Sequence, residues 1–577
     1  MAIPRKLARS AFKWSRQVLP PLSEAERTAI ASNGAWWVAD LLGGAPDWDK
    51  LVALPPARLT VEEQAFFDGP VAELCALSRN LQERGEASDE VVDPALLDVL
   101  ESKGFFRLGL ARSEGGLGFS HTAQSEILRQ LASIEPRLLL FVCRRSGAIS
   151  EGLALPAVAA AGAAVCARAA GAWAAIASVG ETPLASTEAV RHALAELLAE
   201  IYRLDAMRLL AASALDAGHR ASLLLSVVGE DAAEGLHRSL NLAEAIFGAA
   251  TPNGVGHSLQ ATSFRQTAPE ILGRDASPLS DRRRAFFAEM VLRAHAFWPE
   301  ERAAVSENDA VLGLEAFEKP FAGHLAHGAL AKGRAFLSGW TGGLVAHAPE
   351  HAENVQHWQQ LSRYAAAFSF LSELVLLTLG SELDGKDLIG RRLAVILSEL
   401  TALSAVLKRF ECDACPDEDR PLVDYLMARG IARLRLAFSA VIDNLPARWA
   451  ALLFRLTAFP LGVSVPAAAD DLACEVGAIL ASPSHQRSRL TQGLCVANDE
   501  RPMNLERAFA QVSAARPLQE RLRDAGLGGD LDEALAEGLL SEEEWAQLRE
   551  ANAAQTEFVS RTAAPEPARS PHAETQT

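Results

Sequence analysis

Glu270 is the lone acid in the stretch Thr-Ala-Pro-Glu-Ile-Leu-Gly-Arg of this 577-residue chain. This stretch follows two long helical patterns and a turn rich in Pro and Gly. A carboxylate can act as a general base when the proton it removes lies within hydrogen-bonding reach. Glu270 is therefore the candidate base, and its role depends on what faces it.

The residue types that bind metals give no comparable pattern. Cys412 and Cys415 form a C-x-x-C, but a structural zinc site needs four ligands and no second pair has a suitable spacing. The pair also follows a predicted helix, whereas the redox form of this motif opens one. No H-E-x-x-H occurs, and we interpret His324, His327 and His347 as helix-face or loop residues. The sequence therefore predicts no metal site.

A glycine loop at residues 113–119, with the sequence Ser-Glu-Gly-Gly-Leu-Gly-Phe, is also no nucleotide site. It lacks the G-x-G-x-x-G spacing, no Lys-Ser or Lys-Thr follows it, and no predicted strand precedes it. No G-x-S-x-G is present to anchor a serine hydrolase triad. We interpret the loop as a turn between helices.

Two predicted helices must position Glu270. The first, Glu188 to Ala217, has apolar residues at spacings of three, four and seven, which form one stripe of an α-helix. The second covers residues 220–247 and ends in Gly-Ala-Ala-Thr-Pro-Asn-Gly, a series of helix-stop signals. A third strong pattern runs from Leu388 to Phe410, and capping boxes predict further helix starts at Ser23, Thr60 and Ser541.

The composition indicates an almost entirely α-helical protein. Apolar residues make up 49% and aromatic residues 6%, and abundant Ala favours closely packed helices over sheet. The net charge of −18 argues against nucleic acid, because phosphate binding needs clustered Lys and Arg. Seven scattered Cys do not make a disulfide framework, which predicts a reducing cytoplasmic location.

Two stretches bear on membranes. Leu153 to Ala177 is interrupted by Arg168 and consists mostly of Ala, so we predict a buried helix there and no membrane span. The N-terminal stretch places Phe12 and Trp14 among five basic residues, Arg5, Lys6, Arg9, Lys13 and Arg16. Such a segment can lie on an anionic membrane surface. Peripheral contact with the inner membrane is therefore an alternative to a purely cytoplasmic location.

Several longer stretches carry a family resemblance. They include Ala35-Trp-Trp-Val-Ala-Asp-Leu, Arg58-Leu-Thr-Val-Glu-Glu-Gln-Ala-Phe-Phe-Asp-Gly-Pro-Val, Gly115-Gly-Leu-Gly-Phe-Ser, Phe336-Leu-Ser-Gly-Trp-Thr-Gly-Gly and Leu403-Ser-Ala-Val-Leu-Lys-Arg-Phe. Through these motifs the chain resembles the long bacterial acyl-CoA dehydrogenases of fatty-acid β-oxidation, which carry a large extra C-terminal region.

The resemblance implies a fold and a reaction. Family enzymes have an N-terminal helical domain, a middle β-barrel domain and a C-terminal helical bundle, with FAD between the barrel and the bundle. A carboxylate removes the α-proton of the acyl-CoA while the flavin takes the β-hydride, which gives a trans-2-enoyl-CoA. By this resemblance Glu270 is the catalytic base, and Arg274 and Gly248 lie toward the cofactor.

The chain departs from the family in two places. The N-terminal match ends near Phe141, and by Ala189 the sequence already resembles the bundle, so the middle barrel domain with its flavin-binding glycine motif is expected to be missing. The family motif Glu-Gly-x-Asn-x-Leu-x-Arg fits Glu270-Ile-Leu-Gly-Arg274 only if three residues are deleted. The glycine pair that approaches the flavin is replaced by Phe247-Gly248-Ala249-Ala250.

We therefore predict an all-α protein with an acyl-CoA-dehydrogenase-like helical bundle, a large C-terminal helical domain and no β-barrel. The expected domains are a leader, a partial N-terminal helical domain, an eroded C-terminal bundle, the bacterial-type C-terminal extension and a disordered tail, at residues 1–59, 60–150, 151–278, 279–562 and 563–577.

The function expected is that of an acyl-CoA dehydrogenase homologue with little or no activity, in which FAD is lost. Two alternatives remain open: a working enzyme that binds flavin in an unfamiliar way across a subunit interface, and a non-enzymatic partner protein that binds acyl-CoA or a membrane surface. Acyl-CoA and a second copy of the chain are the partners that the resemblance implies. A gene damaged by an internal deletion is disfavoured by the well-patterned helices on both sides of the junction.

Overall fold

The computed structural model describes residues 5–18, 24, 27–28, 35–84, 93–146, 149, 151–179, 182–248, 264–267, 294–462, 468–492, 494–495, 505–526 and 531–562. Within these ranges the protein is almost entirely helical, as predicted. The strands are β1 (Ser178–Val179) and β2 (Thr182–Pro183), which pair antiparallel and are two residues long each.

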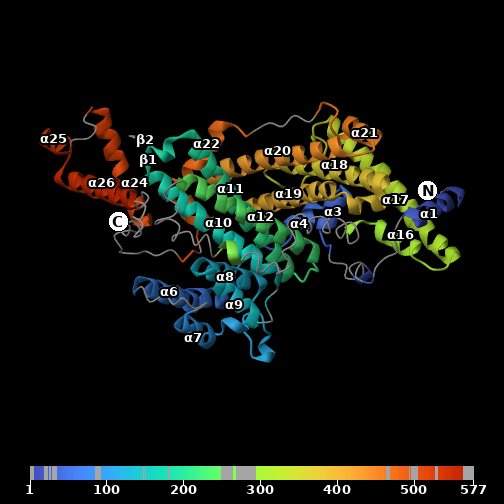
Figure 1. Cartoon of the computed structure of the whole chain (residues 1–577), viewed down its shortest axis with the longest axis horizontal. Coiled ribbons are helices and arrows are strands. Elements are labelled where there is room, and N and C mark those ends of the chain that lie inside the picture. The colour runs from blue at the N-terminus through green and yellow to red at the C-terminus, as the bar shows by residue number, and fades with distance from the viewer. Residues whose placement is uncertain are drawn as a thin grey trace, which may run out of the picture.

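Helices from the first quarter of the chain form a lobe below the main body in Figure 1. They are α5 (Val61–Phe66), α6 (Ala72–Arg84), α7 (Pro94–Ser102), α8 (His121–Ile134) and α9 (Pro136–Ser146). The predicted capping box of Thr60 and Glu63 is present. A π-helical turn at Phe67–Val71 separates α5 from α6. It contains Pro70, which has no N–H for the α-helical ladder.

The centre of the protein is made of α10 (Glu151–Ile176), α11 (Glu188–Asp216) and α12 (Ser222–Phe247), which pack against one another. The bounds of α11 and α12 confirm the two predicted helices. Apart from Glu151 and Arg168, helix α10 consists of apolar and small residues, as expected of a core helix, and it also packs on α8. Its glycines permit close contacts, because a Cβ on Gly171 would lie 2.3 Å from the backbone oxygen of Leu480.

The second half of the chain forms an extended helical layer beside this centre (Figure 1). Its helices are α16 (Trp298–Val305), α17 (Ala310–Trp340), α18 (Val355–Leu379), α19 (Asp387–Cys412), α20 (Arg420–Asn444), α21 (Arg448–Ala458), α22 (Asp470–Leu480) and α23 (His485–Leu490). Helices α19 and α22 pack directly on α11. The leader helices α3 (Val38–Gly43) and α4 (Trp48–Val52) fit into this layer, where Trp48 packs on Trp358 at 4.9 Å.

The two ends of the described chain lie at opposite ends of the molecule in Figure 1. Helix α1 (Arg5–Val18) contacts α16 and α17. At the other end are α24 (Leu505–Asp524), α25 (Leu531–Ala536) and α26 (Glu542–Thr562), which form a small separate core. The predicted capping box of Ser541 and Glu544 is present, whereas Ser23 lies outside the described residues.

Two helices are long and apolar enough to cross a membrane, the segment Gly152–Ile176 of α10 and helix α18. The most apolar parts of these helices are 89% and 78% buried inside the protein, respectively. The first was predicted as a buried helix, and the structure agrees. The sequence analysis missed the second as a span candidate, but its burial in the core gives it the same interpretation.

Candidate functional site

The predicted catalytic residues fall mostly outside the described part of the chain. Glu270 and Arg274 both lie in the range 268–293, for which the structure describes nothing. Gly248 is described, and it ends α12 with a φ of +55° at an exposed position. A Cβ at Gly248 would meet no atom within 4 Å, so no neighbour requires glycine there for space. Phe247 before it is buried and packs on Trp173.

The described helices do not fit a flavin site of the family type. Helix α9 ends at Ser146 and α10 begins at Glu151, so residues 147–150 are all that separate them. Helix α10 then packs on both α8 and α9. At this point in the chain, where the family resemblance leads us to expect the barrel domain, only four residues separate the two helices. Within the described ranges, no structure provides the barrel side of a flavin cradle.

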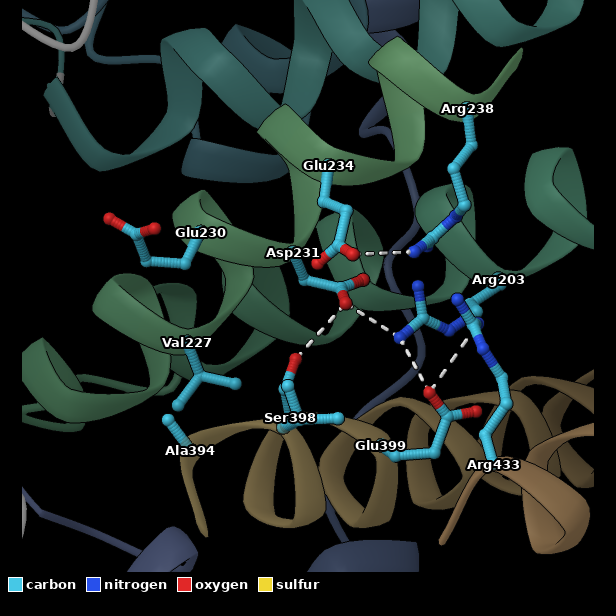
Figure 2. A pocket seen from close by; sticks show the side chains of 11 residues that line it. Arg203, Val227, Glu230, Asp231, Glu234, Arg238, Ala394, Ser398, Glu399 and Arg433 are labelled. Atoms are coloured by element: carbon cyan, nitrogen blue, oxygen red, sulfur yellow. Dashed lines mark hydrogen bonds and ion pairs between the residues drawn. The ribbon is translucent and has the colours of Figure 1, made fainter. Parts of the chain in front are cut away.

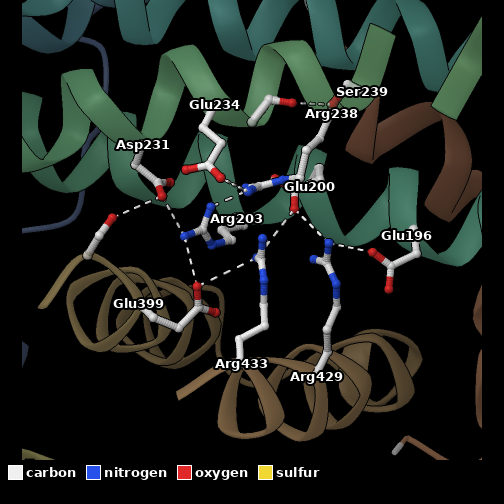
Figure 3. A network of polar contacts seen from close by, with 12 residues as sticks. Glu196, Glu200, Arg203, Asp231, Glu234, Arg238, Ser239, Glu399, Arg429 and Arg433 are labelled. Carbon is white, nitrogen blue, oxygen red and sulfur yellow. Dashed lines mark hydrogen bonds and ion pairs between the residues drawn. The ribbon is translucent and has the colours of Figure 1, made fainter. Parts of the chain in front are cut away.

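The most concentrated polar site in the described protein is a buried set of ion pairs, which we call the charged seam. It connects α11 and α12 with α19 and α20 (Figure 3). Its members are Glu196, Glu200, Arg203, Asp231, Glu234, Arg238, Glu399, Arg429 and Arg433.

Arg203 is at the centre of the seam, with only 2% of its side chain exposed. Its Nη2 lies 2.6 Å from an Asp231 oxygen and 3.2 Å from a Glu399 oxygen (Figure 2). Asp231 also accepts a hydrogen bond from the Ser398 hydroxyl at 3.0 Å. Arg203 on α11 thereby holds carboxylates of α12 and α19 together.

Glu200 is a second centre, one turn before Arg203 and fully buried. Its carboxylate lies 3.1 Å from Arg238, 2.8 Å from Arg429 and 3.8 Å from Arg433. Burial alone would raise the pKa of Glu200, but the charges of the surrounding arginines hold that pKa far below its usual range. Glu200 therefore stays ionised near neutral pH, which suits an ion pair and not a proton carrier.

A depression beside the seam shows how little room remains. Six seam residues line it together with five neighbours, namely Arg203, Asp231, Glu234, Arg238, Glu399 and Arg433 with Val227, Glu230, Ala394, Val395 and Ser398 (Figure 2). The free space is about 50 Å³, which is room for a few water molecules. Neither a flavin ring nor an acyl chain fits among these ion pairs. The seam thus joins helices, and the described geometry gives it no reacting group.

The structure also brings together histidines that the sequence analysis separated. His324 and His327 were interpreted as helix-face residues, but they lie beside His295 and Glu373. Their H-x-x-H spacing was the available signal, whereas Glu373 gave none because it lies 46 or more residues away in the chain. In contrast, Cys412 is the last residue of α19 and Cys415 follows that helix, and both are free thiols.

Two comparisons with known families match separate parts of the chain. The family model described as "Acyl-CoA dehydrogenase, C-terminal domain" matches residues 150–264, which include α10, α11 and α12. The model described as "Acyl-CoA dehydrogenase, C-terminal, bacterial type" matches residues 292–560. The chain belongs to the acyl-CoA dehydrogenase family.

A solved structure of an acyl-CoA dehydrogenase complexed with FAD from Bacillus anthracis is similar to the chain at 10% identity. The match covers 81% of this chain and 97% of that one, with a TM-score of 0.47.

The two matched segments meet at the charged seam. Arg203 and Asp231 come from the segment that matches the family's C-terminal domain, whereas Glu399 and Arg433 come from the bacterial-type segment. The seam is therefore the buried electrostatic contact between the bundle and the extension.

Proposed function

We propose that this chain is an acyl-CoA dehydrogenase homologue that has lost flavin-dependent turnover and serves fatty-acid β-oxidation as a partner protein. The four-residue connection between α9 and α10 is the observation that supports this most strongly. Oxidation of an acyl-CoA needs a base and a hydride acceptor that face each other, and the cofactor supplies the acceptor. Glu270 is a base for which the described chain offers no flavin cradle.

The helices that cover α10 and α11 also support the loss of flavin binding. Helix α10 is covered by α8 and α12, while α11 is covered by α19 and α22. The seam fixes the extension against α11 and α12 through buried ion pairs. These faces are filled by the chain's own helices, which leaves no described face of α10 or α11 free for a cofactor.

The absorption spectrum of the purified full-length protein tests the proposal. We expect no flavin band before or after incubation with excess FAD, and no trans-2-enoyl-CoA from acyl-CoAs in the presence of an electron acceptor. Glu270→Gln should then match the wild type in every assay. A yellow protein with near-stoichiometric flavin would overturn the proposal, and loss of turnover on Glu270→Gln would instead support a working enzyme with an unfamiliar flavin site.

A second candidate function, attachment to a membrane surface, is favoured by an exposed apolar face. On α17 it includes Phe336, Leu337 and Trp340, and on the adjacent α21 it includes Trp449, Leu452 and Leu456. The tryptophans are 56% and 58% exposed. Monomeric soluble proteins rarely expose contiguous apolar side chains of this size without a partner.

The charges around this apolar face fit an anionic lipid surface. Residues 319–349 and 445–462 contain no Asp or Glu, although the chain as a whole has a net charge of −18. They do contain Lys332, Arg448 and Arg455, which are exposed. Helix α1, with exposed Trp14 and further basic residues, packs on α17 near Phe317, toward the other end of that helix from Trp340. Aromatic and aliphatic side chains flanked by Lys and Arg are typical of interfacial binding.

Flotation with vesicles tests this second function. We expect the full-length protein to float with vesicles that contain phosphatidylglycerol, less so at high salt, and not with pure phosphatidylcholine. The double variant Trp340→Ala/Trp449→Ala should reduce the bound fraction at least tenfold. Leu539→Ala is the matched control, because Leu539 is an exposed apolar residue between α25 and α26 at the other end of the molecule. Equal binding to both vesicle types, or no effect of the double variant, would contradict the proposed face.

A further inference from the structure

We propose that His324, His327 and Glu373 bind a divalent transition metal ion of the zinc class in the C-terminal extension. With His295 and Glu301 they form a set that we call the histidine cluster. Within this cluster the ligand atoms of His295, His324 and Glu373 all lie within 4.8 Å of one another, and His327 adjoins them through its contact with Glu373. The cluster is separate from the charged seam and from Glu270, and it does not depend on the function proposed above.

Three packed helices bring the cluster together. His324 and His327 lie one turn apart on α17, so their side chains share a face of that helix. Glu373 lies on α18 and Glu301 on α16, and both helices pack on α17. Gly323, next to His324, lets the ring of Phe297 pack closely on α17, because a Cβ on Gly323 would lie 2.3 Å from that ring.

The donor atoms converge on one carboxylate. Glu373 Oε2 lies 2.8 Å from His324 Nε2, and Glu373 Oε1 lies 3.4 Å from His327 Nε2. A tetrahedral zinc ion with ligands at about 2.0–2.1 Å separates neighbouring ligand atoms by about 3.4 Å. The His327–Glu373 contact already has this spacing, and the His324–Glu373 contact reaches it if the side chains separate by about half an ångström. His324 and His327, whose ligand atoms do not belong to one close group in this structure, must also draw together for both to bind the ion.

Glu301 acts as the second partner of His324. Both of its carboxylate oxygens lie 2.9 Å from His324 Nδ1, and the Glu301 side chain is only 6% exposed. Histidines that bind metals usually donate their second ring N–H to a carboxylate, which fixes the tautomer and aims the other nitrogen at the ion. With its proton on Nδ1, His324 presents the Nε2 lone pair toward Glu373 and His327.

His295 has a different role, although its Nε2 lies 2.8 Å from Glu373 Oε1. Its Nδ1 accepts the backbone N–H groups of Phe297 at 3.2 Å and Trp298 at 3.0 Å, at the start of α16. The neutral ring therefore carries its proton on Nε2 and donates it to Glu373. His295 is a positioning residue for the carboxylate and not a ligand, because ligation through Nε2 would require an imidazolate.

The types of ligand favour such an ion. Two imidazoles and one carboxylate suit zinc and its neighbours in the first transition row, whereas Mg²⁺ and Ca²⁺ prefer oxygen ligands.

Metal analysis of the full-length protein tests the proposal. After chelator treatment and desalting, we expect one equivalent of Zn²⁺ by calorimetry, and one equivalent of Co²⁺ with the visible absorption of a tetrahedral nitrogen–oxygen site. Glu373→Gln and His324→Ala should abolish this uptake. His357→Ala is the matched control, because His357 pairs with Asp424 on the surface at 2.8 Å, away from the cluster.

Milder variants keep the test informative if a ligand variant fails to fold. Glu301→Gln should weaken Zn²⁺ binding about 10- to 100-fold, as expected for a residue behind a ligand. His295→Gln should retain the Co²⁺ spectrum with weaker binding. The proposal is overturned if the folded wild type takes up less than one equivalent, or if folded Glu301→Gln and His327→Ala bind Zn²⁺ as tightly as His357→Ala.

Discussion

Removal of the Arg203 guanidinium should destabilise the protein far more than removal of an exposed arginine. In Arg203→Met, Asp231 keeps only the Ser398 hydroxyl as a partner in the seam, and Glu399 keeps only Arg433 at 3.6 Å. These carboxylates are about as buried as Arg203, with 5% and 6% of their side chains exposed. Breaking a buried pair by removing one partner costs about 3–5 kcal/mol.

The matched control is Arg112→Met. Arg112 pairs with Glu62 at the surface, where both side chains are more than half exposed. Exposed pairs contribute about 0–1 kcal/mol, so this variant should unfold like the wild type.

Hydrogen exchange provides the assay, because a chain of this size does not unfold in two states. Amides of α11, α12 and α19 should lose protection in Arg203→Met, whereas those of α24 and α26 should not. A double variant, Arg203→Met/Asp231→Asn, should regain part of the loss, because it leaves no unpaired Asp231 charge. If Arg203→Met exchanges like Arg112→Met, the seam does not hold the bundle to the extension.

Two further predictions concern helix contacts. Asp216 at the end of α11 accepts hydrogen bonds from the backbone of the first turn of α8, at His121 and its neighbour. Burial would raise the pKa of Asp216, but hydrogen bonds from the side chains of His121 and Thr122, together with these backbone N–H groups, lower that pKa. The stabilisation of the folded protein by ionised Asp216 should therefore be complete above about pH 4–5 and be lost as the pH falls further. In Asp216→Asn, the melting temperature should consequently depend less on pH in the acid range. Gly171→Ala should lower the melting temperature, because its Cβ would lie 2.3 Å from the backbone oxygen of Leu480, whereas Gly229→Ala, with nothing within 4 Å, should raise it slightly.

Local signals in the sequence predicted the helices and two of the three caps proposed. The apolar stripe over residues 188–217 matches α11 at Glu188–Asp216, and the pattern from Leu388 matches α19 at Asp387–Cys412. These features depend on residues within one or two helical turns of each other, so the spacing of residues in the sequence is enough to predict them. The exception was the π turn at Phe67–Val71, since Pro70 within a helical pattern allows several local solutions.

The polar sites depend on contacts that no local pattern contains. Arg203 and Glu399 are 196 residues apart, and His324 and Glu373 are 49 residues apart. In each case the sequence shows only a charged residue on a predicted helix, where a solvated position is the ordinary expectation. Packing decides which of these residues become buried, and burial then requires each charge to find a partner. The sequence analysis therefore missed both the seam and the histidine cluster.

The composition of α10 suits a protein in which the N-terminal helices pack directly on the bundle without a barrel between them. In the family resemblance a barrel separates the N-terminal helices from the bundle, so its loss would leave apolar surfaces on both sides. Here α10 packs on both α8 and α12, and 13 of its 26 residues are Ala. Small side chains let helices approach closely, and Gly162 is needed where a Cβ would come within 2.5 Å of Leu236. Such fitted packing on both faces supports a protein adapted to direct contact between these helices, because a recent internal deletion would leave the junction with surfaces made for another domain.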